Sequence, residues 1–534
     1  AFAARPRSST ETAHVTKRTP FPDSPLVIIA VVCLLLAGSL ALIRPADRMR
    51  LYPDDGMFYG IVATNTVQGA PFSFDGGVSR TTGFHWAGLF PPLAAAAARR
   101  ALFGGGAYRD FFDAIFAVDA LATGLAAFAL ALAAGRMVRS RWTLGLLAAV
   151  LFQVLLLGFG MESSLAAPLL LALLVEATGE KPRRGVLFAL ALAVPAARLD
   201  LVPIAALAAA LGVALPRRTE RPRLAVAAAA GLAVGVALVL VANTLVGGEP
   251  FSSSVIAKGT AVFLVREDLR QALAANAAFL VGFAAILAAR LAAKPLRDPR
   301  GIVVAAIGLL LLLQVSVQRS LGGNNLGRWY DVVWTALFFV SAAALFDALP
   351  VRGRAGALAG VVCLGICALP LAPREAIRSR LHVAHAEDDA YYASWAEFGE
   401  AVRRSVPEGA RLAADDLPGA LCYYSRRPVV ALDGLANSPE FVRRYVLTGR
   451  VGDYVREGVD YVVLFLDDPL LRRFGAQVDR GAADIEFPIG FLHKTTIPAG
   501  AFRFSAADVV LRTKVRAFWS EFWLVRVPKG RVGV

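Results

Sequence analysis

Long apolar runs recur between residues 25 and 373 of this 534-residue chain, and they constrain its fold more than any other feature. Candidate spans occupy residues 25–43, 108–134, 143–160, 163–177, 184–199, 201–215, 223–246, 272–292, 301–318, 329–348 and 355–373. A helix needs about 20 apolar residues to cross a bilayer, and several of these runs reach that length. The chain is 57% hydrophobic, more than a soluble protein of this size. We therefore predict an α-helical polytopic membrane domain with about 11 transmembrane helices.

Basic residues set the expected orientation of these spans. The net charge is +15, and basic clusters fall on every second connection, at 136–141, 181–184, 217–223, 294–300 and 352–354. Cytoplasmic connections carry such an excess of Lys and Arg. The N-terminus is therefore predicted inside and the polar first loop outside, in a multi-pass protein of the bacterial inner (plasma) membrane. Because these basic clusters are short and lie between apolar runs, we expect membrane lipid as a partner and expect no nucleic-acid binding.

The chain divides into three predicted parts. Residues 1–24 are polar and are predicted to be a disordered cytoplasmic tail. Residues 25–373 form the transmembrane domain, with a large first outer loop at 44–107. Residues 374–534 have no spanning run, and predicted strands at 412–414, 429–432 and 461–465 are separated by helical patterns. They indicate a C-terminal extracytoplasmic α/β domain.

Two adjacent carboxylates, Asp54 and Asp55, follow directly on the first apolar run. Charged groups at a membrane exit cost desolvation free energy unless water, a cation or a substrate meets them. The pair is therefore a candidate for acid–base work at the membrane surface. The alternative is that it stabilises the start of a surface helix predicted over 56–68. Hard cations favour carboxylate oxygens, so a divalent cation near the pair is compatible with either reading.

The other predicted outer connections carry the remaining polar candidates. They are His85, Glu162, Arg198, Asp200, Ser253, Lys258, Arg328 and Tyr330. Acids, bases and hydroxyls gathered on one side of a membrane can line a cavity open to that side. Such a cavity suits a lipid carrier with a charged head group.

Five sequence stretches occur in an order that resembles a known family. They are Asp54-Asp55, Thr82-Gly83-Phe84-His85-Trp86, Gly160-Met161-Glu162-Ser163-Ser164, Ala197-Arg198-Leu199-Asp200, and Pro250-Phe251-Ser252-Ser253 through Lys258. Together they resemble the polytopic GT-C glycosyltransferases, most closely the terminal arabinofuranosyltransferase branch, over residues 25–370. The stretches 419–425 and 433–437 resemble the outer domain of that branch. The resemblance implies a GT-C-like fold and transfer of a sugar from a polyprenyl-phosphate donor to a glycan or lipid acceptor.

Phosphate binding is assigned to the basic candidates. A guanidinium matches phosphate in a bidentate way, so Arg328 is a candidate, and Lys258 can act as a point charge. Each can instead anchor a span end at the interface. His85 can assist the acceptor or the phosphate. Arg198 can contact phosphate, or it can form a buried ion pair with Asp200 that shapes the hairpin.

Sugar or acceptor contact is assigned to Glu162, Asp200, Tyr330 and Ser253. For Glu162 the alternative is an acid at the start of the next helix. An inverting transfer needs a base that deprotonates the acceptor hydroxyl, and the resemblance points to Asp54 or Asp55 without choosing between them. We predict no structural zinc, because the His and Cys residues show no ligand spacing.

Two other functions fit an envelope membrane protein. A transporter or flippase of a lipid-linked substrate would show internal symmetry, and no repeat is evident. A non-catalytic envelope assembly protein would tolerate substitution of Asp54 and Asp55.

Overall fold

The computed structural model describes most of the chain. The described residues are 25–43, 48–179, 181–214, 221–261, 270, 273, 274, 276–292, 299–322, 328–348, 386–489, 500–515 and 520–529. The tail predicted over 1–24 and the candidate span 355–373 lie outside these residues, so both stay predictions.

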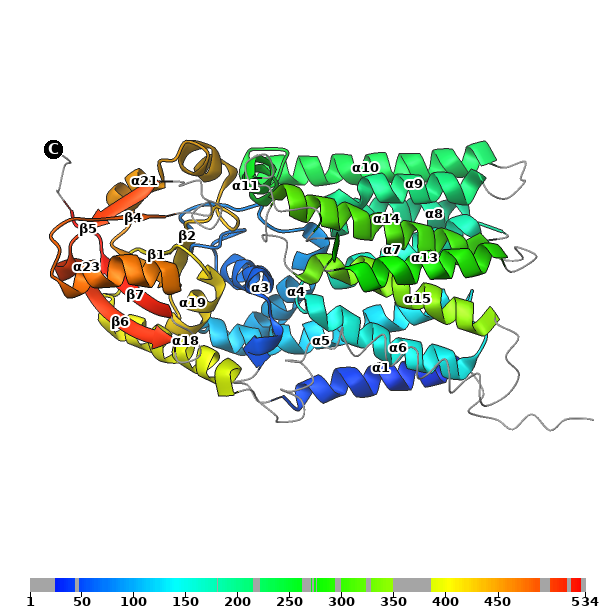
Figure 1. Cartoon of the computed structure of the whole chain (residues 1–534), viewed down its shortest axis with the longest axis horizontal. Coiled ribbons are helices and arrows are strands. Elements are labelled where there is room, and N and C mark those ends of the chain that lie inside the picture. Colours follow the sequence, from blue (N-terminus) through cyan, green and yellow to red (C-terminus); the bar gives the residue numbers. More distant parts are fainter. Residues whose placement is uncertain are drawn as a thin grey trace, which may run out of the picture.

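A bundle of apolar helices forms one end of the molecule, with long axes nearly parallel (Figure 1). Its helices are α1 (Pro25–Ala41), α5 (Tyr108–Ala134), α6 (Arg141–Leu155), α7 (Ser163–Thr178), α8 (Arg184–Ala197), α9 (Val202–Ala214), α10 (Arg221–Gly247), α13 (Ala277–Ala292), α14 (Pro299–Gly322) and α15 (Val332–Ala348). Leu- and Ala-rich stretches favour helix intrinsically. Each of the ten candidate spans before 355–373 therefore contains a helix where the sequence predicts one.

The outward faces of these helices are apolar. Among the described residues, four helices are long and apolar enough to cross a membrane, and other apolar helices are shorter. Large side chains such as Leu35 on α1, Leu125 on α5 and Leu245 on α10 are 69%, 57% and 77% exposed. A soluble protein rarely leaves such wide apolar surfaces in water. They indicate a lipid-facing belt, as expected for a multi-pass membrane protein.

Three helices lie between the bundle and the C-terminal end of the molecule (Figure 1). They are α3 (Asp54–Val67), α4 (Trp86–Phe103) and α11 (Ser253–Ala261). The surface helix predicted over 56–68 is thus present, but it begins two residues earlier, at the acid pair. The extended Pro53 fixes that start, because proline lacks the N–H that a preceding turn would need.

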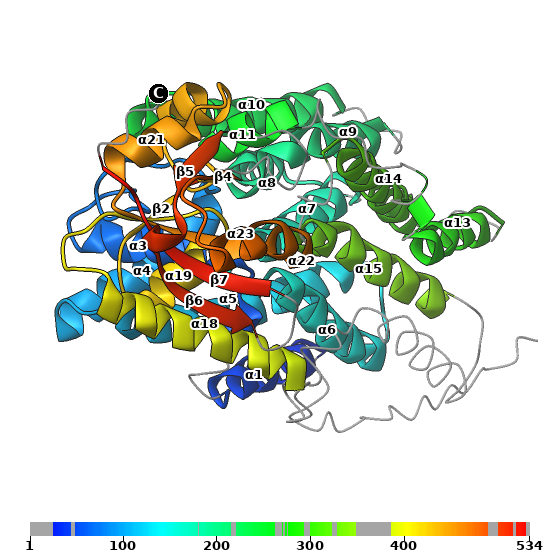
Figure 2. The ribbon, with the colours of Figure 1, turned by 60° about the vertical axis from the view of Figure 1, so that its left-hand side comes forward.

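The C-terminal domain, residues 386–529, is built on a mixed sheet (Figure 2). Its strands are β1 (Leu412–Ala414), β2 (Val429–Ala431), β3 (Tyr461–Leu466), β4 (Ile485–Pro488), β5 (Ala501–Phe504), β6 (Val509–Val515) and β7 (Ser520–Arg526). The five-stranded sheet has the order β2-β1-β3-β7-β6, and β4 pairs with β5 in a second sheet. Strands β2, β1 and β3 are parallel, and β7 runs antiparallel to both β3 and β6.

Several short helices complete this domain. They are α18 (Ala386–Ser405), α19 (Pro418–Ser425), α20 (Pro439–Phe441), α21 (Val451–Gly458), α22 (Asp468–Leu470) and α23 (Ala476–Asp479). Helix α18 packs Trp395 and Phe398 on Phe522 of β7, with ring centroids 4.0 and 5.1 Å apart. Trp395 and Trp523 are both fully buried. These tryptophans therefore belong to the hydrophobic core of the domain.

The loop after β2 joins the C-terminal domain to the membrane part. Asn437 accepts a hydrogen bond from Ser79 Oγ at its side chain (3.0 Å) and one from Thr81 Oγ1 at its backbone carbonyl (2.9 Å). Ser253 Oγ, on α11, donates to the Leu435 carbonyl (3.2 Å). The first loop and α11 thus hold the same short segment, which fixes the C-terminal domain over α3.

Substituting Gly83 by alanine is expected to loosen this junction. A Cβ at position 83 would lie 1.8 Å from the Leu435 carbonyl oxygen, a backbone atom that cannot rotate away. Overpacking of this kind costs about 1–3 kcal/mol, so the melting temperature should fall and the C-terminal domain should become more sensitive to protease.

Gly105 supplies the matched control. An added Cβ there meets nothing within 4 Å. Gly105→Ala should change the unfolding free energy by less than about 0.5 kcal/mol. Equal melting temperatures for Gly83→Ala and Gly105→Ala would show that the close approach of Gly83 to Leu435 is not needed.

Candidate active site

The acid pair occupies the first turn of α3. Asp54 is the first residue of the helix, and Asp55 is half-buried. The side chain of Asp54 lies outside what the structure describes. The free N–H groups and dipole of a helix start favour negative charge, so this position suits the helix-stabilising alternative as well as a base. The role of each aspartate stays a prediction.

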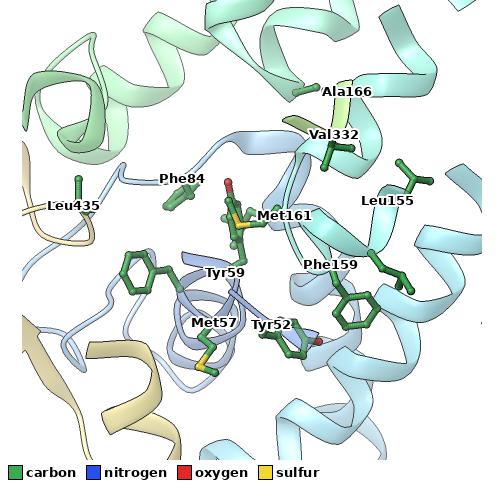
Figure 3. Packing of buried hydrophobic residues seen from close by; sticks show 14 of the residues in the cluster. Tyr52, Met57, Tyr59, Phe84, Leu155, Phe159, Met161, Ala166, Val332 and Leu435 are labelled. Carbon is green, nitrogen blue, oxygen red and sulfur yellow. The ribbon is translucent and has the colours of Figure 1, made fainter. Parts of the chain in front are cut away.

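Tyr59 connects the acid pair to the second loop. It lies four residues after Asp55, on the same face of α3. Its hydroxyl donates to Glu162 Oε2 at 2.6 Å and accepts from the backbone N–H of His85 at 3.1 Å. Figure 3 shows the Tyr59 ring between Phe84 and the Met161 segment. Tyr59 is not among the candidates predicted from the sequence, although its spacing of four residues from Asp55 was the available signal.

Burial keeps this phenol in its donating form. It raises the pKa of Tyr59 well above its usual value, and the nearby Glu162 carboxylate raises it further. Tyr59 therefore remains protonated at neutral pH and continues to donate to Glu162.

Glu162 is buried, with 2% of its surface exposed. It occupies the N-cap position of α7, but its side chain makes no cap bond. It bonds to Tyr59 instead and lies 3.9 Å from His85 Nε2. Helix α4 comes this close because Gly88 has no side chain: a Cβ there would lie 2.9 Å from Glu162 Cβ and 2.8 Å from the Tyr59 ring. Glu162 is thus a bridging carboxylate rather than a cap.

Arg198 lies between α8 and α9 with all its guanidinium nitrogens engaged. Nε and Nη2 donate to the two Asp200 carboxylate oxygens at 3.0 and 2.5 Å, and Nη1 donates to Ser163 Oγ at 3.0 Å. The Tyr330 ring centroid lies 4.4 Å from Arg198 Cζ. This arrangement favours the buried ion pair over direct contact with a phosphate. Arg198, Asp200 and Tyr330 line a small cavity together with Gln314.

The remaining candidates fall elsewhere. Ser253 begins α11, and its backbone N–H donates to Thr82 Oγ1 at 3.3 Å, so it belongs to the junction with the C-terminal domain and not to the Glu162 cluster. Lys258 lies on α11, and Arg328 begins a short 3-10 turn, Arg328–Asp331. The side chains of Lys258 and Arg328 lie outside the described residues. Their phosphate roles stay predictions.

A metal site is not evident in the described part of the chain, where no group of three or more His, Cys, Asp or Glu side chains is arranged to hold an ion. Because the Asp54 side chain is outside that part, a divalent cation beside Asp54 and Asp55 stays a prediction.

The C-terminal domain brings a further carboxyl group to Asp55. Strand β2 ends two residues before Asp433, whose Oδ1 accepts from the Leu435 N–H at 2.9 Å. Burial raises the pKa of Asp433 to about 7, and the charges of Asp55, Asp416 and Asp415 act in the same direction. Asp415 and Asp416 directly follow β1. The carboxyl ends of neighbouring parallel strands share one edge of a sheet, so the acids that follow the predicted strands 412–414 and 429–432 were a signal for this cluster in the sequence.

Asp433 is expected to make stability depend on pH. Its pKa is raised on folding, so its stabilising contribution is complete below about pH 4, the ordinary value, and is lost as the pH rises through about 7. A shift of this size corresponds to at most about 4 kcal/mol. The melting temperature of wild type relative to Asp433→Asn should therefore fall between pH 4 and pH 7.5. A difference that stays constant over this range would contradict a raised pKa.

Comparison with known proteins gives a fold but no curated relative. The crystal structure of ArnT from Cupriavidus metallidurans in the apo state matches with a TM-score of 0.50 and 13% identity, covering 90% of this chain and 97% of that chain. The crystal structure of the Archaeoglobus fulgidus oligosaccharyltransferase, tethered with an acceptor peptide, matches with a TM-score of 0.45 and 12% identity. The match covers 82% of this chain and 68% of that chain. A family model described as a domain of unknown function (DUF8728) matches residues 381–518. No curated protein matches.

The likeness to ArnT shows a shared fold over 90% of this chain, and the GT-C superfamily stays a prediction. The arabinofuranosyltransferase branch stays a prediction. Taken with the apolar helices, the fold shared with ArnT indicates a multi-pass membrane protein.

Proposed function

We propose that this chain is an inverting membrane glycosyltransferase of the GT-C type. It takes a sugar from a polyprenyl-phosphate donor and passes it to a glycan or lipid acceptor of the cell envelope, on the outer side of the membrane. The observation that carries the proposal is the half-buried Asp55 on the first turn of α3, beside the Tyr59–Glu162 pair, in a chain that matches ArnT over 90% of its length.

The reaction follows from one carboxylate of the pair. Asp54 or Asp55 accepts the proton of the acceptor hydroxyl, while that oxygen attacks the anomeric carbon from the face opposite the phosphate. The bond between the anomeric carbon and the phosphate oxygen breaks, and polyprenyl phosphate leaves with the electron pair. Because the attack comes from the opposite face, the anomeric configuration inverts.

Buried polar contacts support this assignment by holding the loops that meet at α3. The Tyr59–Glu162 bond ties α3 to the start of α7, and the Arg198–Ser163 bond ties the start of α7 to the connection between α8 and α9. Reacting groups must be held in a fixed geometry for efficient transfer, and hydrogen bonds in a dry environment supply that rigidity.

The decisive experiment uses the purified full chain in lipid vesicles with radiolabelled polyprenyl-phosphate sugars and a glycan acceptor. The expected result is a labelled acceptor formed in step with released polyprenyl phosphate. Movement of the labelled lipid across the vesicle membrane without transfer would favour the transporter or flippase alternative. Folded protein that neither transfers nor moves any donor would favour the assembly-protein alternative.

A further inference from the structure

An open groove lies where the first loop meets the C-terminal domain, with a volume of about 670 Å³. One wall is the turn at Asp75, Gly76 and Val78, and the other comes from the end of α18 and the segments that enter β1 and β2. Gly76 allows the two walls to meet, because its φ is +74° and a Cβ there would lie 2.8 Å from Pro428. We call this feature the arginine groove, after Arg403, Arg411, Arg426 and Arg427, which line it.

The charges that line the arginine groove do not cancel. Its carboxylates are Asp75 and Glu408, against four guanidinium groups. Asp75 is buried, and it accepts from Ser73 Oγ, Ser79 N–H and Ser79 Oγ at 2.8, 2.9 and 2.8 Å. Its lone pairs are therefore largely engaged by its own loop rather than by the arginines.

Arg403 is neutralised from outside the groove, since it holds Glu400 in a two-oxygen contact at 2.6–3.1 Å. Arg411, Arg426 and Arg427 then remain against the carboxylates of Asp75 and Glu408, so an excess of one positive charge is left among the lining residues. An excess of guanidinium groups on a concave surface attracts anions and favours bidentate contact with phosphate or carboxylate.

Arg427 is fixed in place without losing its charge. Its Nη atoms donate to the backbone carbonyls of Arg403, Val406 and Pro407 at 3.1, 2.5 and 3.0 Å. Its Nε is buried and makes no hydrogen bond to the described residues. Backbone carbonyls satisfy donors but carry no net charge, so the guanidinium keeps its attraction for an anion.

Arg426 adopts a backbone conformation that is costly for its type. Its φ and ψ are 57° and 28°, in the left-handed region. A residue other than glycine held there costs on the order of 1–3 kcal/mol, and such outliers cluster at functional positions. Arg426 is the C-cap of α19, a position where a left-handed residue commonly ends a helix, and its side chain is exposed.

We propose that the arginine groove binds phosphate or carboxylate groups carried on a glycan chain. The choice of a glycan as carrier rests on the proposed function, but anion binding does not. An anionic lipid would need a wide apolar surface for its chains, and in the described part of the groove the exposed apolar side chains are Val78, at 46%, and Pro428. No aromatic side chain lines the groove among the described residues, so stacking of nucleic-acid bases is not supported.

The test is equilibrium binding to the full chain in detergent micelles. The probes are fluorescent dextran phosphate, polygalacturonate, unmodified dextran of equal length, and vesicles containing phosphatidylglycerol. We expect the two anionic polymers to bind at least about tenfold more tightly than neutral dextran, and raising the salt from about 0.05 M to about 0.5 M to weaken that binding.

A double variant, Arg411→Gln with Arg426→Asn, should lose about tenfold in affinity for both anionic polymers. Asparagine is chosen at position 426 because it tolerates the left-handed backbone. Arg480→Gln is the control: it removes one positive charge from an exposed position outside the groove, at the end of α23, and should leave binding unchanged.

Equal affinity for charged and neutral dextran would overturn the proposal, and so would equal losses in the double variant and in Arg480→Gln. Tighter binding to vesicles than to either polymer would overturn the glycan as carrier. If the double variant fails to fold, the probe and salt comparisons on wild type decide the question. If the protein binds anions but shows no sugar transfer, the proposal of an anion-binding groove is supported and the proposed function is contradicted.

Discussion

Replacing Asp55 by asparagine is expected to reduce the transfer rate by about 10²–10⁴-fold, the usual contribution of a positioned general base. Asparagine keeps the size of the side chain but cannot accept the acceptor proton. The half-buried Asp55 lies one turn from Tyr59 and within electrostatic reach of Asp433, so both neighbours should remain in place. The measurement is the initial rate of acceptor labelling in vesicles at saturating donor, together with donor binding.

Asp54→Asn is made in parallel, because sequence and structure leave open which carboxylate is the base. Loss of rate in one variant, with donor binding retained in both, would assign the role. Asp484→Asn is the control, since Asp484 is 65% exposed and its contact with Arg503 is at 3.5 Å. Full activity of both Asp54→Asn and Asp55→Asn would show that neither aspartate is the catalytic base.

Arg198→Met is expected to produce the largest loss of stability, about 3–5 kcal/mol, because it leaves the carboxylate of Asp200 without its buried partner. The side chain of Arg198 is 3% exposed and bonds both oxygens of Asp200, whose side chain is 29% exposed, as well as Ser163. Methionine fills a similar length but donates nothing. The measurement is the midpoint of unfolding in mild detergent, followed by tryptophan fluorescence.

Two comparisons separate the buried ion pair from a general effect of losing an arginine. Arg503→Met breaks a 2.7 Å contact with Glu486 in which both side chains are more than half exposed, so it should cost about 0–1 kcal/mol. Removing both members of the buried pair, Arg198→Met with Asp200→Leu, should be less damaging than Arg198→Met alone, because no uncompensated charge remains. A double variant less stable than Arg198→Met would show that the Asp200 carboxylate has a second partner of equal importance.

The sequence alone determined the local features of this protein. Apolar runs predicted the helices of the bundle, and alternating patterns after residue 374 predicted strands where β1, β2 and β3 are found. The reason is that helix and strand formation depend on neighbouring side chains, whose periodicity is visible in one dimension. The same reasoning placed the acid pair at the start of a helix, although it put that start two residues late.

Only the tertiary structure decided which polar residues meet. Tyr59 and Glu162 are 103 residues apart in the chain, and Ser79 and Asn437 are 358 apart, yet each pair is hydrogen-bonded. The tertiary structure places Ser253 at the junction with the C-terminal domain instead of the candidate site, and it places Asp433 near Asp55. Such contacts depend on how whole elements pack, and no local pattern of charge or hydropathy encodes that packing.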